Sequence, residues 1–253
     1  MENCGFGWQN RVLDATLVAS AQNDALPVDN LRNPSGAASL GWRCPRNTAV
    51  LTMSLSQAGA FRVFSLHRTN CMPTATLAIS AALGADIVWS GQVTGCMNGQ
   101  IVLVAPAEIQ ADTVTFSLTD QDNTDGFLSI PLAYAGPIWQ PVRNYSTEST
   151  SGRNLGTDSA TSLNGVLFTE NRWIQRTLKI AHQSLGNADA GQIEQILRAS
   201  AAGQNTLFLP VPDGGPEFLA QKALLGRLTG DDISNPFGVA DRHSVTLTLT
   251  ESL

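Results

Sequence analysis

The sequence predicts a mainly β protein: an antiparallel β-sandwich in the N-terminal half, followed by a smaller α+β domain with one clear helix. Before residue 140, apolar and polar residues alternate with a period of two in most segments, and these segments are rich in β-branched residues. Turn residues recur about every ten positions, as they do in sandwiches. Only one later stretch has the 3.6-residue apolar period of a helix.

The first half opens with a short alternating segment over 11–20 and a loop-like stretch over 21–46, where Pro, Asn and Gly are dense. Period-two alternation then predicts strands over 50–55, 61–66, 76–83, 87–89, 101–104 and 113–119. Gly59 and Ala60 are expected to form the turn between the first two. The last strand alternates most regularly, with Val114, Phe116 and Leu118 on one face.

A proline-rich segment divides the chain into two halves. Pro131, Pro137 and Pro141 exclude a helix over 126–141 and hold the backbone extended around Trp139. The favoured interpretation is a linker whose tryptophan packs on the preceding domain, and the alternative is an anchor for a neighbouring subunit. The predicted division is a sandwich over 1–135, a linker and loop over 136–158, and an assembly domain over 159–253.

The second half is mixed. Residues 144–158 are polar and contain glycines, which predicts a loop that is mobile or ordered by a partner. A hairpin is expected from 165–169 and 172–182, turning at Glu170 and Asn171. The helix is predicted over 187–202, capped by Asn187 or Asp189 and ended by Gly203. Strands are expected over 206–211 and 244–250, and 218–228 is ambiguous between helix and strand.

Composition excludes several classes of function. Charged residues make up 14% of the chain and hydrophobic residues 43%, so the surface is mostly neutral and polar, which suits protein–protein contact. The net charge is −6, and no basic stripe predicts nucleic-acid binding. No apolar run is long enough for a membrane span. The N-terminal ten residues lack the features of a signal peptide, so synthesis in a cytoplasm without an export signal is expected.

The four cysteines, Cys4, Cys44, Cys71 and Cys96, are widely spaced and form no Cys-x-x-Cys pair. This spacing disfavours a zinc ribbon. Their even number permits two disulfides, but four buried thiols are favoured in a chain of this length.

Several short motifs resemble a known family. Residues 27–31 (PVDNL), 41–43 (GWR), the strand at 50–55 and the turn at 122–126 (DNTDG) resemble a discoidin-type, galactose-binding-like jelly roll. With the linker at 136–141 (GPIWQP), the segment 172–176 (RWIQR) and 226–228 (GRL), the whole resembles a minor or distal tail protein of a tailed bacteriophage. The resemblance implies a structural protein of the tail tip or baseplate, located in the virion and assembled in the host cytoplasm.

That resemblance also implies partners: further copies of the chain in a ring, and other tail-tip, tube or hub proteins. Aromatic and arginine side chains are the usual anchors of such interfaces. The predicted anchors are Trp139, Tyr145, Arg172, Trp173 and Arg176.

The alternative function is carbohydrate binding, in which the sandwich would hold a cell-surface glycan. An aromatic side chain would stack on the sugar and polar groups would orient it. The candidates are Trp42, Arg43 and Trp89. The competing interpretation is that both tryptophans pack within the sandwich, which is the usual place of tryptophan.

Catalytic motifs are missing from the sequence. There is no Gly-x-Ser-x-Gly, no His-Glu-x-x-His and no phosphate-binding Gly-x-x-x-x-Gly-Lys, and the three histidines fall in different predicted elements. We therefore expect no enzyme and no cofactor. Asp120, Asp122 and Asp125 precede Gly126 and resemble the oxygen ligands of calcium loops, but the spacing misses the EF-hand pattern. An Asx-rich turn is the favoured interpretation of this segment, and a calcium site is the alternative.

Overall fold

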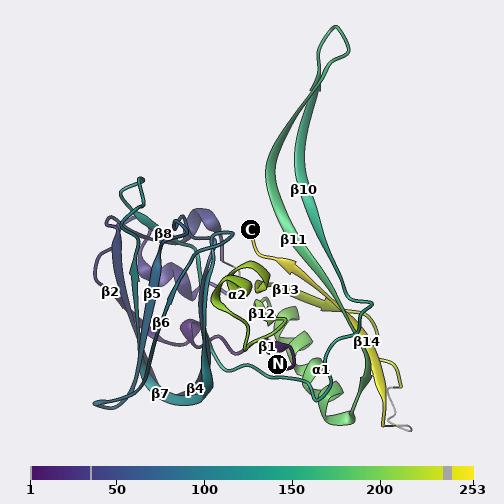
Figure 1. The fold of residues 1–253 in the computed structure, drawn as a ribbon, viewed down its shortest axis with the longest axis horizontal. Helices are drawn as coiled ribbons and strands as arrows, with labels where there is room; N and C mark the ends of the chain where they lie inside the picture. The colour runs from purple at the N-terminus through teal and green to yellow at the C-terminus, as the bar shows by residue number, and fades with distance from the viewer. Residues whose placement is uncertain (1, 35, 236–240) are drawn as a thin grey trace.

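The computed structural model describes residues 2–34, 36–235 and 241–253, and it consists mostly of β-strands in two domains that lie side by side (Figure 1). A β-sandwich forms the first domain. A six-stranded sheet with two α-helices forms the second, and a long hairpin projects from it well beyond both domains. The predicted fold class is confirmed.

The sandwich is built on a five-stranded antiparallel sheet in the order β2-β4-β7-β5-β6. Strand β9 also pairs with β4, and strands β3 and β8 form a separate two-stranded sheet. Trp42, Phe61, Phe64 and Phe116 are among the large side chains fully enclosed in its core. The strands are β2 (Thr16–Ala19), β3 (Trp42–Cys44), β4 (Thr48–His67), β5 (Thr76–Leu83), β6 (Asp86–Thr94), β7 (Ile101–Thr119), β8 (Leu128–Ile130) and β9 (Leu132–Gly136). Short 3₁₀ helices occupy η1 (Arg11–Leu13), η2 (Val28–Arg32) and η3 (Ala38–Leu40).

Two predicted strand boundaries within the sandwich are wrong. The segments 50–55 and 61–66 belong to one strand, β4, and the segments 101–104 and 113–119 belong to β7. The pairing of β4 with β7 shifts in register between Ser54 and Gly59 instead of ending there. A β-bulge uses the same small residues as a turn but lets the strand continue, so Gly59 and Ala60 mark a bend in one long strand.

The second domain contains an antiparallel sheet in the order β1-β12-β13-β14-β11-β10. The strands are β1 (Gly5–Gly7), β10 (Thr150–Thr161), β11 (Leu167–Leu185), β12 (Thr206–Leu209), β13 (Leu224–Gly230) and β14 (His243–Glu251). Helix α1 (Asn187–Ala201) matches the predicted helix, and its Ile193 and Ile196 are fully buried. The predicted side-chain cap is not formed, because the capping position is Gly186. The ambiguous stretch divides into helix α2 (Pro216–Lys222) and strand β13.

The N-terminal strand and the linker tryptophan both belong to the second domain. Strand β1 pairs with β12, although it precedes the sandwich in the chain. Trp139 exchanges two backbone hydrogen bonds with Phe6 of β1, and the two rings lie 5.9 Å apart. The expected packing of Trp139 on the preceding domain is therefore wrong: the ring joins the core of the second domain. A long-range strand pair, invisible in the local sequence, sets this position.

The segment predicted as a polar loop and a short hairpin is one long hairpin. Strand β10 takes up residues 150–161, and β11 runs without interruption through Glu170 and Asn171. The chain turns instead between Ser162 and Val166, where Gly165 has a left-handed φ of 78°. A strand that is exposed on both faces needs no apolar alternation, and so β10 lacks the pattern used to predict strands.

Candidate interaction surface

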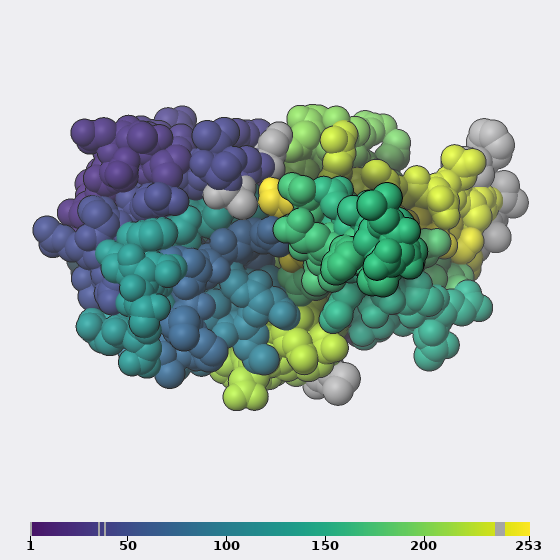
Figure 2. Space-filling view, turned by 90° about the horizontal axis from the view of Figure 1, so that it is seen from above, coloured from purple at the N-terminus to yellow at the C-terminus, as the bar shows by residue number. Residues whose placement is uncertain are grey.

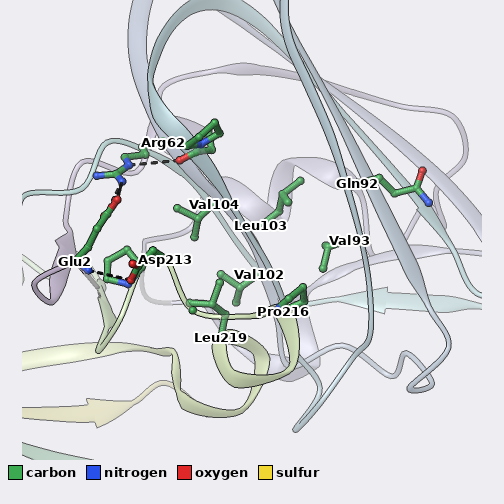
Figure 3. Close-up of a pocket in the computed structure, with 14 residues that line it drawn as sticks. Glu2, Arg62, Gln92, Val93, Val102, Leu103, Val104, Asp213, Pro216 and Leu219 are labelled. Carbon is green, nitrogen blue, oxygen red and sulfur yellow. Dashed lines mark hydrogen bonds and ion pairs between the residues drawn. The ribbon is translucent and has the colours of Figure 1, made fainter.

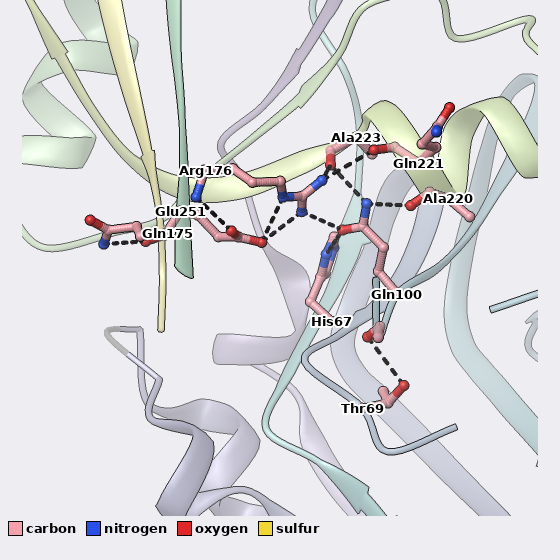
Figure 4. A network of polar contacts seen from close by, with 10 residues as sticks. His67, Thr69, Gln100, Gln175, Arg176, Ala220, Gln221, Ala223 and Glu251 are labelled. Carbon is pink, nitrogen blue, oxygen red and sulfur yellow. Dashed lines mark hydrogen bonds and ion pairs between the residues drawn. The ribbon is translucent and has the colours of Figure 1, made fainter. Parts of the chain in front are cut away.

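A polar network fixes the two domains against each other (Figure 4). Gln100 of the sandwich donates hydrogen bonds of 2.5 and 2.8 Å to the carbonyls of Ala220 and Ala223, at the end of α2. Its side-chain oxygen accepts from Nδ1 of His67 and from Arg176 of β11. Nε2 of His67 lies 2.8 Å from the Ser65 hydroxyl, from which a neutral imidazole accepts a hydrogen bond. Burial lowers the pKa of His67 to about 4, which favours the same form.

Arg176 is at the centre of this network. Its guanidinium donates to Glu251 of β14 at 2.6 and 3.0 Å, and to the carbonyls of Gln221 and Ala223. Burial alone would raise the pKa of Glu251, but the hydrogen bonds and charge of Arg176 outweigh burial and hold that pKa below its usual value. The base of the projecting hairpin is therefore held rigidly to the rest of the molecule.

We call residues 150–176 the arm. The pairing of β11 with β14 begins only at Thr177, so the part of β11 within the arm has no neighbour on that edge. Strand β10 is the end strand of the sheet, so the other edge of the arm is open too. Almost every arm residue is solvent-exposed. Figure 1 shows the arm rising away from both domains, and Figure 2 looks down onto its end, which lies over the second domain beside the sandwich.

The arm carries apolar side chains that no other segment covers in the part of the chain that the structure describes. Leu163, at the turn, is fully exposed, and Phe168 exposes 63% of its surface. A two-stranded hairpin is marginally stable in water, and exposed apolar groups of this size mark interaction surfaces. The exposed apolar residues of the arm are Leu155, Leu163, Val166, Leu167, Phe168, Trp173 and Ile174.

A groove of about 860 Å³ lies at the base of the arm. One wall is the arm itself, including Arg153 and Ile174, and the other is the tip of the sandwich with Arg68 and Asn98. Lys222, at the end of α2, also lines it.

A second, smaller cleft of about 310 Å³ lies between the sandwich and the loop before α2 (Figure 3). Its lining is mostly apolar, with Val102, Leu103 and Leu219 among its residues. Arg62 and Glu2 close one end by an ion pair. Its charged lining residues are Glu2, Arg62 and Asp213.

The structure separates the five predicted interface anchors into two groups. Arg172 and Trp173 lie on the arm, where Arg172 pairs with Asp158 of the facing strand. The Trp173 ring covers Gly156, where a side chain would meet it, so Gly156 and Trp173 form one unit. Trp139, Tyr145 and Arg176 instead contact residues outside the arm: Phe6, Phe208 and Glu251.

Sequence reasoning missed the apolar end of the arm. An otherwise polar stretch is interrupted by four apolar residues, Leu163, Val166, Leu167 and Phe168. This interruption was the feature of the sequence from which an apolar interaction surface could have been predicted. The network residues His67 and Gln100 carried no such signal, because their partners are distant in sequence.

The structure packs each of the three candidate sugar-binding residues against other groups of the chain. Trp42 is 1% exposed and donates its indole N–H to the Ala21 carbonyl, so no face of the ring is free to stack on a sugar. Trp89 is partly buried against Phe64, with ring centres 5.4 Å apart. The guanidinium of Arg43 lies 4.4 Å from the centre of the Phe127 ring. The tryptophans have the packing role that was the competing interpretation.

The three aspartates of the turn at 120–126 have separate partners. Asp120 accepts from the backbone N–H of Met72, Asp122 from the Thr74 hydroxyl, and Asp125 from the Asn70 amide. Over residues 2–34, 36–235 and 241–253, no group of three His, Cys, Asp or Glu side chains is placed to hold a metal ion. The arrangement is that of an Asx-rich turn.

All four cysteines are free thiols, and three of them are buried. Burial raises the pKa of Cys4 to about 12, which keeps this thiol protonated. In the part of the chain that the structure describes, no helix has the length and apolar character needed to cross a membrane.

No family model and no curated protein matches this chain. Among solved structures, the family 32 CBM of C. perfringens NanJ, in complex with galactose, is 16% identical, with a TM-score of 0.40 over 53% of this chain and 98% of that chain. A fucose-binding module of Streptococcus pneumoniae is 12% identical, with a TM-score of 0.41 over 51% of this chain and 96% of that one.

A putative alpha-L-fucosidase from Bacteroides thetaiotaomicron is 11% identical, with a TM-score of 0.44 over 53% of this chain and 30% of that enzyme. None of these three is described as a phage tail protein. At these identities and TM-scores the likeness places no ligand on this chain. The fold and the exposed surfaces define a two-domain, mainly β protein with a projecting arm.

Proposed function

We propose that this protein is a structural subunit that assembles with further copies of itself through the arm. The observation that carries the proposal is the exposure of the arm: two open strand edges and a cluster of uncovered apolar side chains around Leu163 and Phe168. Open edges and exposed apolar groups favour association, and proteins that remain monomeric normally cover or charge them.

The arm also has the geometry of an assembly element. Its base is fixed by the Arg176 network, so binding at its end does not require the rest of the molecule to become ordered. An arm that contacts a different surface of the next copy makes a heterologous contact, and such contacts close into rings when the rotation permits. The predicted setting in a bacteriophage tail tip or baseplate, with tube or hub proteins as further partners, extends this proposal.

The experiment is to shorten the arm and measure the mass of the full chain by sedimentation velocity. Gly156 and Trp173 face each other in the hairpin, so residues 157–172 are replaced by Asn-Gly, which closes a two-residue turn. Within the described part of the chain, residues 157–172 form hydrogen bonds and ion pairs only inside the arm, so the two domains should remain folded. We expect wild-type assemblies and a monomeric variant.

A matched control separates the arm from exposed apolar surface in general. Ile87 on β6 exposes 69% of its surface and lies on the sandwich, away from the arm. Phe168→Thr should weaken assembly, whereas Ile87→Thr should leave it unchanged. A wild-type chain that stays monomeric at about 100 µM, or a shortened chain that assembles normally, would refute the proposal. For the phage setting, the test is whether purified virions contain the chain.

The second candidate function is saccharide binding by the β-sandwich. The reason to test it is that sandwiches of similar fold have been solved with galactose or are described as fucose-binding modules. The shortened chain is the suitable probe, because assembly cannot then contribute avidity. Binding to a glycan array would support this candidate, and a blank array with folded protein would remove it.

A further inference from the structure

We infer that the groove at the base of the arm is the surface that receives the arm of the next copy, whose Asp158 and Glu170 would face Arg68, Arg153 and Lys222. This inference rests on the proposed function and names the two surfaces that meet. Four observations support it: the charge of the groove, its backbone, its apolar floor and the charge of the arm.

The groove gathers positive charge in a protein whose net charge is −6. Four cationic side chains line it, but Glu251, its one carboxylate, is already bonded to Arg176. In the described part of the chain, Arg68, Arg153 and Lys222 have no carboxylate within 4.0 Å. Cations held together on the walls of a groove raise the local concentration of anions, so this groove suits a negatively charged occupant.

The backbone at the sandwich tip is held in an uncommon conformation. Arg68 has a φ of 61° and Asn98 a φ of 54°, and they are two of the four non-glycine residues with positive φ in the described part of the chain. This conformation is usual for Asn98, because Asn98 and Gly99 form the two-residue turn between Met97 and Gln100, but it costs Arg68 on the order of 1 kcal/mol. Both residues line the groove.

The floor of the groove is partly apolar. Ile174 is half-exposed on the arm wall, and Leu178 and Leu224 also line the groove. The incoming arm carries Phe168 two strand residues, or about 7 Å, nearer the tip than its acidic pair, and Leu163 lies at the turn itself. An arm laid in the groove would therefore bring apolar groups to apolar groups and carboxylates to cations. A volume of about 860 Å³ lies in the range of binding clefts.

The acidic pair of the arm is exposed to an external partner, and together with Arg172 it gives residues 157–172 a net charge of −1. Asp158 and Glu170 are directly opposite each other on β10 and β11, and like charges in this position destabilise a hairpin. Arg172 pairs with Asp158, which leaves Glu170 without an ion-pair partner among the described residues. The acidic pair cannot reach the groove of its own chain, because Asp158 lies five strand residues, or about 16 Å, farther along the arm than Arg153. The charges are therefore complementary only between copies.

The test is a charge exchange in the full chain, measured by sedimentation velocity. Glu170→Lys removes the acid of the arm, and Lys222→Glu removes a cation of the groove. We expect each single variant to assemble at least about tenfold more weakly than the wild type. The double variant should recover most of the loss. An equimolar mixture of the two single variants should also assemble, because one supplies an intact groove and the other an intact arm.

Matched controls carry the same charge changes elsewhere: Glu108→Lys and Arg46→Glu, at exposed positions of the sandwich. If Glu170→Lys and Lys222→Glu assemble as these controls do, while the shortened arm abolishes assembly, the groove inference is overturned and the proposed function stands. If the wild type itself is monomeric at about 100 µM, both are overturned. Recovery in the double variant or in the mixture would support the inference, because a general loss of stability cannot produce it.

Discussion

Arg172 and Arg176 lie four residues apart on β11, and each forms an ion pair, but replacing them should have very different effects on stability. Arg176 and Glu251 have side chains only 19% and 9% exposed, whereas Arg172 and Asp158 are 60% and 62% exposed. Arg176→Met would leave the Glu251 carboxylate buried without its cation. It would also remove the donors to the carbonyls of Gln221 and Ala223.

Breaking a buried ion pair by removing one partner costs about 3–5 kcal/mol. For a chain of this size each kcal/mol lowers the melting temperature by about 2–4 °C, so Arg176→Met should lower it by roughly 6–20 °C. Arg172→Met removes an exposed pair, which contributes about 0–1 kcal/mol, so its melting temperature should stay within a few degrees of the wild type.

The assay is thermal unfolding of the shortened-arm background by calorimetry, where assembly does not contribute to the melting temperature. The shortened arm lacks Arg172, because residues 157–172 are replaced. The Arg172→Met control is therefore measured in the full chain, at a protein concentration too low for assembly. Arg176→Met/Glu251→Gln should recover part of the loss, because no buried charge remains. If Arg176→Met and Arg172→Met cost the same within 1 kcal/mol, the assignment of Arg176 to an internal network is wrong.

Two further predictions concern the cores. Burial lowers the pKa of both His67 and His182 to about 4, below the usual 6.5, so the unfolded chain takes up protons first as the pH falls. The contribution of the two neutral histidines to the free energy of unfolding should be fully present above pH 6.5. It should fall by up to about 3 kcal/mol per histidine as the pH decreases towards 4. Urea unfolding at pH 7 and 4.5 measures this change, and equal free energies at the two pH values would contradict the prediction. Trp42→Ala should cost about 3–5 kcal/mol, because the ring is sealed in the sandwich core. Urea unfolding again measures this, and a loss below 1 kcal/mol would show that the ring is not part of the core.

Local patterns determined much of the secondary structure. The alternation over 113–119, the apolar stripe of the helix at 187–202 and the alternating strand at 244–250 each correspond to an element that buries one face. Burial of one face requires a fixed period in the sequence, so such elements can be read without knowing their partners. The composition likewise indicated a neutral polar surface suited to protein contact.

Pairing between distant segments decided the rest. Whether Trp139 packs inward depends on β1, which is more than a hundred residues away. Arg176 differs from Arg172 because Glu251, Gln100 and the end of α2 reach it. A hairpin is predicted here, but its strand β10 is expected to be a loop, because a strand exposed on both faces has no buried side to impose a period. The sequence by itself therefore determined which segments bury one face. The tertiary structure decided which polar and aromatic side chains remain exposed to a partner, because burial depends on neighbours that chain order does not specify.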